Sequence, residues 1–302
     1  MALKVLFLGN HTVGIKVLDT LIREKDIELV GIIAHPKDPE DGIRYQSVFD
    51  YAKLKNIKVI RSNLNKEEDI NFIKLLQPDL LFVTDFKFLL KKDVLKIPKI
   101  GSVNLHPSLL PKYRGRASIN WAIINGEKEL GLTGHWINEG TDSGDIIKQL
   151  KFKLDFSENI NDALQKYYPL YKEITKEIIN IIKSGDFLGQ KQIEKDSSYF
   201  PKRIPNDGLI NWNYNNIKIY NFVRAISYPY PGAFSYLNKE KIIIWETNIL
   251  SDTAFEKTIP NGYIIDYLKN KIYVKCFNSA ILISRFEPSN IPIKIGDVFK
   301  SI

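Results

Sequence analysis

Three polar side chains in the sequence are of the types that acyl transfer to an amine requires. Asn104 and His106 lie two residues apart, and Asp142 follows 38 positions after Asn104. An amide N–H can stabilise the oxyanion of a tetrahedral intermediate, and an imidazole can accept the proton of an attacking amine near neutral pH. A carboxylate can orient that imidazole and stabilise its positive charge. Because an amine attacks by itself, this chemistry needs no protein nucleophile.

The segments around these residues indicate how they would come together. "GSVNLH" is typical of a buried strand, and alternation along it places Asn104 and His106 on one face. Pro107 ends the hydrogen-bond ladder where the chain leaves the sheet. "NEGTDSGD" is a Gly-rich turn that follows the strand-like run "GLTGHWI" and contains Asp142. We therefore expect the amide, the imidazole and the carboxylate to converge at the carboxyl edge of a sheet.

Other roles for these residues stay open from the sequence. A lone histidine on a strand is often a hydrogen-bonded core residue. His106, His135 and Asp142 could together hold a metal, but no HExxH or Cys/His spacing supports this, and we expect none. Ser108 is too near His106, and lacks the G-x-S-x-G context, to form a Ser-His pair. "GNHTVG", residues 9–14, lacks the dinucleotide and P-loop signatures, so we expect a tight turn that could line a ligand site.

Basic side chains near these motifs predict a phosphate-bearing ligand. Arg114 and Arg116 follow the histidine, and a guanidinium has the planar fork that recognises phosphates and carboxylates. Lys202 and Arg203 lie in "FPKRIPNDG", a turn-rich stretch at an expected domain junction, where ligand pockets are common. The alternative is that all four are solvated surface charges.

The composition is that of a soluble globular protein, with 44% hydrophobic and 26% charged residues. A net charge of +8 favours an anionic partner, but residues 201–302, with 13 Lys and Arg against 8 Asp and Glu, contain no dense basic run, which argues against nucleic acid. No apolar run approaches the ~18 residues of a membrane span and no signal peptide is evident, so we expect a cytoplasmic protein with no membrane partner. The single cysteine, Cys276, excludes an internal disulfide and is expected to be a small buried side chain.

Alternating strand-like and helix-like segments predict an α/β domain with a mostly parallel sheet covered by helices on both faces. The expected strands are "KVLFLG", "IELVGIIAH", "IKVIR", "DLLFVT" and "GSVNLH", separated by amphipathic helical segments. A long helix is expected from about residue 160 to about residue 184, kinked at Pro169 and ended by Gly185.

Beyond Pro201, β-branched and partly alternating runs predict a second domain. Five short strands need closure to hide their edges, so we expect a small β-barrel of the OB-like type. The predicted domains are residues 1–200 and 201–302. The five runs are "AFSYLN", "KIIIWETNI", "GYIIDYL", "KIYVKCF" and "AILISRF".

The two polar motifs resemble those of the N10-formyltetrahydrofolate-dependent formyltransferase family. The resemblance rests on "NLHPSLLPKYRG" together with "GTDSGD", and it implies that Asn104, His106 and Asp142 are the catalytic residues. It also implies a Rossmann-like catalytic domain and N10-formyltetrahydrofolate as cofactor, bound near the loop after the fourth strand, with tetrahydrofolate as product. Expected folate contacts are Phe82, Thr84, Asp85, Phe86, Phe88 and Leu89, and expected acceptor contacts are His11, Ser108, Lys112, Arg114, Lys202 and Arg203.

Within that family the chain is similar to formyltransferases that modify UDP-4-amino-4-deoxyarabinose and other nucleotide-linked 4-amino sugars. This similarity covers nearly the whole chain and includes "INWAIINGE", "FPKRIPNDGLINW" and "FVRAISYPYPGAFSY". It implies a UDP- or dTDP-linked 4-amino-4-deoxy sugar as acceptor, for lipopolysaccharide, O-antigen or another surface glycan, and it allows for a homodimer. Pro107 and Ser108 stand where the arabinose-type enzyme has Gly-Ser, which leaves open a dTDP-linked 4-amino-4,6-dideoxyglucose.

Two other activities stay open. The alternative is methionyl-tRNA formylation, with the C-terminal barrel as an RNA-binding module. Those enzymes have a basic, Gly-rich loop after the second strand, whereas this chain has the mixed-charge "HPKDPEDGIRYQS". The third activity is hydrolysis of the formyl-folate. Glycinamide ribonucleotide formyltransferase lacks the second domain and is disfavoured. Because the chain ends at "VFKSI" without an extension, we expect no fused partner domain.

Overall fold

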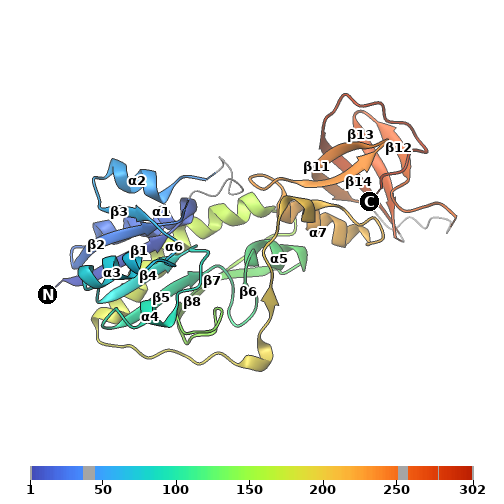
Figure 1. Ribbon diagram of the computed structural model, residues 1–302. Helices are drawn as coiled ribbons and strands as arrows, with labels where there is room; N and C mark the ends of the chain where they lie inside the picture. The colour runs from blue at the N-terminus through green and yellow to red at the C-terminus, as the bar shows by residue number, and fades with distance from the viewer. Residues whose placement is uncertain (1, 37–44, 251–257, 278, 301–302) are drawn as a thin grey trace. The chain divides into compact units, whose positions relative to one another are not determined.

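The computed structural model describes residues 2–36, 45–250, 258–277 and 279–300 (Figure 1). The chain forms two compact units. The first contains Met1–Gly115, Leu130–Phe152 and Gln165–Tyr199, and the second contains Arg116–Glu129, Lys153–Leu164 and Phe200–Ile302. The second unit therefore consists of two short segments that precede residue 200 and of all residues from 200 onward. No helix among the described residues is long and apolar enough to cross a membrane.

The first unit is built on a seven-stranded sheet with the order β3-β2-β1-β4-β5-β7-β8. The first five strands in this order are parallel, and β7 runs antiparallel to β5, which confirms the mostly parallel sheet. The strand order reverses between β1 and β4, where open α/β sheets bind ligands beyond the carboxyl ends of their strands. The strands are β1 (Leu3–Gly9), β2 (Ile27–Ala34), β3 (Val59–Arg61), β4 (Leu80–Thr84), β5 (Gly101–His106), β7 (Glu129–Trp136) and β8 (Ile146–Lys153).

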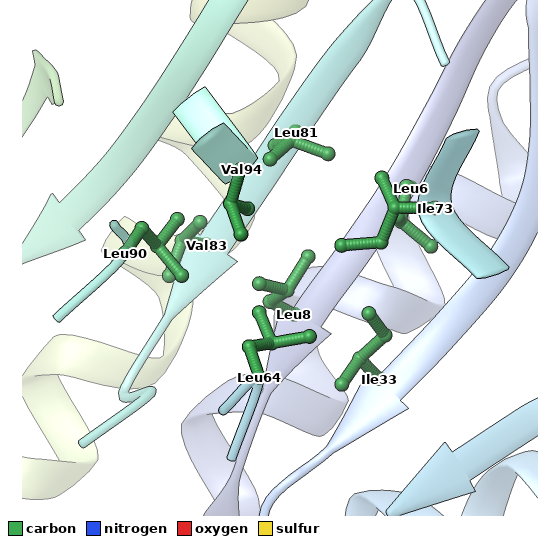
Figure 2. Packing of buried hydrophobic residues seen from close by; sticks show 9 residues of the cluster. All are labelled: Leu6, Leu8, Ile33, Leu64, Ile73, Leu81, Val83, Leu90 and Val94. Carbon is green, nitrogen blue, oxygen red and sulfur yellow. The ribbon is translucent and has the colours of Figure 1, made fainter. Parts of the chain in front are cut away.

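Apolar side chains on both sides of these strands explain why helices cover the sheet. On one face, Leu6 and Leu8 of β1 and Leu81 and Val83 of β4 pack with residues of α3 and α4 in a buried cluster (Figure 2). Helix α1 packs against β1, β2 and β4. The helices of the chain are α1 (His11–Arg23), α2 (Val48–Leu54), α3 (Glu67–Leu76), α4 (Lys92–Leu95), α5 (Ser118–Ile124), α6 (Ile160–Lys183) and α7 (Asn216–Ile226), and of these α5 and α7 belong to the second unit.

Helix α6 confirms the long helix expected from the sequence. It contains Pro169, and Gly185 follows its last turn with a positive φ of 82°, the conformation in which glycine ends many helices. The helix lies against β7, because a Cβ atom added at Gly134 would fall 2.1 Å from Cδ1 of Ile178. A small residue at position 134 therefore lets the helix approach the strand that carries His135.

The second unit contains an antiparallel five-stranded sheet with the order β10-β11-β14-β13-β12. Residues near the C-terminus bridge both edges of this sheet, since Lys300 pairs with Tyr236 and Val298 pairs with Tyr263. This confirms the expected C-terminal β domain, and Cys276 is buried in it as expected. The strands are β10 (Ala233–Leu237), β11 (Glu240–Ile249), β12 (Ile264–Leu268), β13 (Lys271–Cys276) and β14 (Ser279–Glu287).

A short ladder holds the segment that follows β5. Strand β6 (Arg114–Gly115) pairs with β9 (Tyr199–Phe200), which follows the 3-10 turn Glu194–Asp196. A second 3-10 turn, Pro205–Gly208, begins the part of the chain that leads to the C-terminal sheet. The ladder therefore connects two parts of the chain about 80 residues apart, as the hydrogen-bonded pairs across it show.

Candidate active site

Neighbouring strands bring two of the predicted residues and one further histidine together. Asn104 and His106 lie at the carboxyl end of β5, where the alternation of a strand puts both on one face. In the antiparallel pairing of β5 with β7, Asn104 lies directly opposite His135. The turn after β7 carries Asp142, so one edge of the sheet holds an amide, two imidazoles and a carboxylate.

The hydrogen bonds of His106 identify the nitrogen that can accept a proton. The side chain is buried, and its Nε2 lies 2.7 Å from the carbonyl oxygen of Tyr113. A carbonyl oxygen only accepts hydrogen bonds, so Nε2 must donate. The neutral imidazole then has its lone pair on Nδ1, which lies 3.5 Å from Oδ2 of Asp142. Nδ1 is therefore the basic atom, with a carboxylate beside it to stabilise the imidazolium.

Asp142 lies in a turn whose shape depends on its glycines. A Cβ atom added at Gly144 would fall 1.8 Å from the carbonyl oxygen of Trp136, so only glycine fits there. The backbone N–H of Gly115 donates to Oδ2 of Asp142 at 2.9 Å. Burial raises the pKa of the Asp142 carboxyl, but the positive charges of His106 and His135 in their protonated forms and the Gly115 N–H outweigh this and hold the pKa well below its usual value. The carboxylate is therefore ionised at neutral pH.

His135 orients the amide of Asn104. Its Nδ1 lies 2.8 Å from the carbonyl oxygen of Trp136 and must donate to it, which leaves Nε2 of the neutral ring as an acceptor. That Nε2 lies 3.2 Å from Nδ2 of Asn104, whose other contact, with Oδ1 of Asp142, is long at 3.4 Å. The amide nitrogen thus points into the site, and one of its N–H groups is only weakly used.

Sequence reasoning considered His135 only as a metal ligand and missed this orienting contact. The sequence signal near His135 is the strand-like run "GLTGHWI". It predicts a strand, but it does not predict that this strand pairs antiparallel with β5. Among the described residues, no group of three or more His, Cys, Asp or Glu side chains is arranged to hold a metal ion.

The residues expected to contact folate divide into two groups. Phe82 and Thr84 are fully buried within β4. Asp85 follows the strand and forms an ion pair with His11, whose Nδ1 lies 2.6 Å from Oδ2 of the carboxylate. The ion pair lies where the strand order reverses between β1 and β4. It connects His11, which was expected to contact the acceptor, with Asp85, which was expected to contact the folate.

The side chains that follow Asp85 form an aromatic surface beside this point. Phe88 stacks on the ring of His35, with centroids 4.7 Å apart, and Phe86 meets both rings edge-on. Leu89 is 73% exposed. Aromatic and apolar side chains next to polar groups suit a flat heterocycle such as a pterin.

The remaining residues expected at the acceptor lie in different environments. Ser108 is buried, and its hydroxyl donates to the carbonyl oxygen of Lys112, whose side chain is exposed. The guanidinium of Arg114 is fully buried. Lys202 and Arg203 belong to the second unit, where Lys202 is exposed and Arg203 lies over the ring of Trp121. The mixed-charge loop expected to separate sugar from tRNA enzymes lies mostly outside the described residues.

Comparisons with known proteins agree with this architecture. Residues 3–178 match the family described as formyl transferase, and residues 203–302 match its C-terminal domain. The bifunctional polymyxin resistance protein ArnA of Wigglesworthia glossinidia brevipalpis is 35% identical over 293 residues, which are 96% of this chain and 44% of that protein. The chain therefore spans less than half of that relative.

Two further proteins are similar over nearly their full length. The methionyl-tRNA formyltransferase of Clostridioides difficile strain 630 is 32% identical over 303 residues, covering 99% of this chain and 96% of that protein. The crystal structure of WlaRD, a sugar 3N-formyl transferase solved with dTDP and 5-N-formyl-THF, has a TM-score of 0.70 at 23% identity and covers 95% of this chain and 99% of its own. On the family matches and these relatives, the chain belongs to the formyl transferase family.

Proposed function

We propose that this protein moves a formyl group from N10-formyltetrahydrofolate to the 4-amino group of a UDP- or dTDP-linked 4-amino-4-deoxy sugar. The observation that carries formyl transfer is the convergence of Asn104, His106 and Asp142 in one site. The donor follows from membership of the formyl transferase family, and the 5-N-formyl-THF bound to WlaRD supports it. The aromatic surface of Phe86 and Phe88 would hold the folate ring.

The side chains of the site divide the reaction between them. The folate supplies an activated formyl group. The weakly used N–H of Asn104 would donate to the formyl oxygen as negative charge develops on it during attack by the amine. Nδ1 of His106 would take the proton of the attacking nitrogen, and Asp142 would stabilise the resulting imidazolium. His106 can then return the proton to the departing N10 atom, so that the net change is one N–C bond formed and one broken.

A small acceptor is supported by the positions of positive charges in the second unit. Lys275 is 5% exposed and Arg224 is 7% exposed. Arg285 forms an ion pair with Glu246, and Arg203 stacks on aromatic rings. These four side chains belong to the excess of positive charge in residues 201–302, yet each is buried, paired or stacked. Solvent-facing lysines such as Lys269 and Lys271 are left as the positive charge that an RNA backbone could contact, which is less than the count in the sequence suggests.

Methionyl-tRNA formylation is the second candidate. It is favoured by the Clostridioides difficile relative, which is similar over nearly its whole length. The name of that relative specifies methionyl-tRNA as its acceptor. ArnA has a similar sequence identity to this chain, but the matched region is less than half of its length.

Mass spectrometry distinguishes the candidates. The pure protein would be incubated with N10-formyltetrahydrofolate and, in separate reactions, with UDP- and dTDP-linked 4-amino sugars or with methionyl-tRNA. We expect a formyl-sized mass gain on one sugar only. A gain on the tRNA alone would replace our proposal with the second candidate. Loss of cofactor without any formylated acceptor would point to hydrolysis of the formyl-folate.

A further inference from the structure

Arg114 is a charged side chain with no exposed surface, and all three nitrogens of its guanidinium are hydrogen-bonded within the first unit. Nε and Nη2 donate to Oε1 of Gln192 at 3.1 and 2.9 Å. Nη1 donates to both carboxylate oxygens of Glu194, at 2.9 and 3.1 Å, and to the hydroxyl of Tyr199. A guanidinium bound in this way is directed at protein groups and not at a phosphate in solvent.

Gln192 connects Arg114 to the turn that carries the catalytic carboxylate. Its Oε1 accepts from the guanidinium, and its Nε2 donates to the carbonyl oxygens of Asp142 and Gly144 at 2.8 and 2.7 Å. The orientation of the amide follows from chemistry, because a guanidinium only donates and a carbonyl only accepts. Each of its four hydrogen-bonding positions is therefore used.

The residues on either side of Arg114 contact the catalytic side chains directly. The carbonyl oxygen of Tyr113 accepts from Nε2 of His106, and the N–H of Gly115 donates to Oδ2 of Asp142. Ser198 holds the same three-residue segment through its backbone. The backbone N–H of Tyr113 donates to Oγ of Ser198 at 2.9 Å, and the backbone N–H of Arg114 donates to the carbonyl oxygen of Ser198 at 2.8 Å.

Two residues in this arrangement have a backbone conformation that needs support. Tyr113 has a φ of 60° and Asp142 a φ of 50°, in the left-handed region that residues with a Cβ rarely occupy. Such conformations persist where the surrounding contacts over-determine them. Gln192 and Ser198 supply such contacts, so residues 192–198 brace both sides of the catalytic pair.

We propose that Arg114 and Gln192 are positioning residues, through which residues 192–198 hold the Asp142 turn against His106. The proposal takes the chemical role of Asp142 and His106 from the proposed function. It replaces the phosphate contact expected for Arg114 from the sequence. Neither residue touches the reacting atoms, and both act by fixing the distance between carboxylate and imidazole.

The test compares one substitution at two neighbouring positions. Gln192→Met keeps the length of the side chain but removes its donors to Asp142 and Gly144. Gln190→Met is the matched control, because Gln190 is exposed and its hydrogen bonds to Ile146 are made by the backbone. Arg114→Lys is a second variant, since a lysine cannot reproduce the planar fork that grips Gln192.

The first measurement does not depend on turnover. Hydrogen exchange of the Gly115 amide, whose N–H donates to Oδ2 of Asp142, would be followed by NMR in the full-length protein without ligands. When the Asp142 turn is less firmly held, this hydrogen bond opens more often, so exchange should be faster in Gln192→Met and in Arg114→Lys. It should stay at the wild-type rate in Gln190→Met. A purely structural role would instead speed the exchange of amides throughout the sheet, including those of β1.

The second measurement is steady-state kinetics with whichever acceptor the wild-type protein formylates. We expect kcat to fall by about 10–100-fold in Gln192→Met with KM for the folate within about 2-fold of wild type, because a small misplacement of catalytic groups is costly. A wild-type exchange rate of the Gly115 amide together with a wild-type kcat in a folded Gln192→Met protein would overturn the proposal. If the wild-type protein formylates no acceptor, the proposed function fails, and the NMR comparison still decides whether Gln192 positions Asp142.

Discussion

The basic atom of His106 follows from a single hydrogen bond. Because Nε2 is committed to the Tyr113 carbonyl oxygen, the nitrogen that would accept the amine proton in the proposed reaction is Nδ1, which faces Asp142. In many catalytic histidines a carboxylate holds the N–H on the far side of the ring from the reacting atoms. Here a backbone carbonyl fixes the tautomer, and the carboxylate lies beside the nitrogen that we propose as the reacting atom.

His106→Gln separates these two roles. The glutamine amide can reach the Tyr113 carbonyl oxygen in place of Nε2 but carries no base at the position of Nδ1. We expect kcat to fall by about 10²–10⁴-fold, the range for loss of a general base, with a melting temperature within a few degrees of wild type. Steady-state kinetics and thermal unfolding check this. Near-normal turnover would rule out His106 as the base.

Asp142→Asn removes the counter-charge of the imidazolium. The amine proton is then accepted less readily, so kcat should fall, and the acid limb of its pH dependence should move to lower pH. Measurements of kcat from about pH 5 to pH 9 check this. If kcat falls in Asp142→Asn but the acid limb stays at the wild-type pH, the limb belongs to another group.

The same substitution has a signature in stability. The pKa of Asp142 is lower in the folded protein than its ordinary value of 3.8, so its ionisation stabilises the fold above that value. This contribution is lost as pH falls below the ordinary value and through the folded-state pKa. The difference in unfolding free energy between wild type and Asp142→Asn should therefore shrink as pH falls below about 4, as urea titrations at a series of pH values would show.

At the scale of elements, local patterns predicted what each strand and helix contributes, but not which strands pair. The apolar run of β5 and the alternation of Asn104 and His106 along it were readable from the sequence, as was the length of α6. The pairing of β5 with β7, and with it the contact of His135 with Asn104, depends on tertiary packing and has no local signal.

Arg114 shows the same limit for a single residue. A guanidinium next to a catalytic motif suggested an anionic ligand, because exposure cannot be read from one residue type. Its partners Gln192 and Glu194 lie 78 and 80 positions further along the chain. The burial of Arg114 becomes apparent only in the structure, where the segment that contains Gln192 and Glu194 lies beside β6.

The turn after β7 gives a prediction at this scale. In Gly144→Ala the new Cβ atom would overlap the Trp136 carbonyl oxygen, so the turn must shift and carry Asp142 away from His106. We expect a loss of activity of at least about 10-fold together with a loss of stability. Gly185→Ala is the control. It has an unfavourable φ but no atom within 4 Å of the new Cβ, so it should cost stability alone. Equal activity in the two variants would contradict this account of the turn.

At the scale of the whole molecule, the second unit takes in chain segments that precede residue 200. Helix α5 packs against α7 within this unit, and the amide of Asn120 donates to the carbonyl oxygen of Ala225 at 2.8 Å. Ile119 and Ile123 of α5 are buried. A protein cut at the predicted domain boundary would lose α7 and expose these side chains.

Truncation after residue 200 should therefore destabilise the remaining chain. We expect residues 1–200 to unfold at a lower urea concentration than the intact protein and to bind a dye for exposed apolar surface, since burial of side chains such as Ile119 and Ile123 is worth about 1.5–3 kcal/mol each. Circular dichroism during a urea titration checks this. Unfolding at the wild-type concentration would establish residues 1–200 as an autonomous domain.

The brace formed by residues 192–198 also bears on protein synthesis. Ribosomes deliver a chain from its N-terminus, and the parallel sheet, with its strands β1 to β5, is complete by residue 106. The side chains of the catalytic motifs have been made by residue 142, but the contacts that fix Tyr113 and Asp142 wait for Gln192 and Ser198. If Asn104, His106 and Asp142 have the proposed roles, a nascent chain that stops between these points carries every reactive group but lacks the geometry to use them, and competence for catalysis arises late in translation.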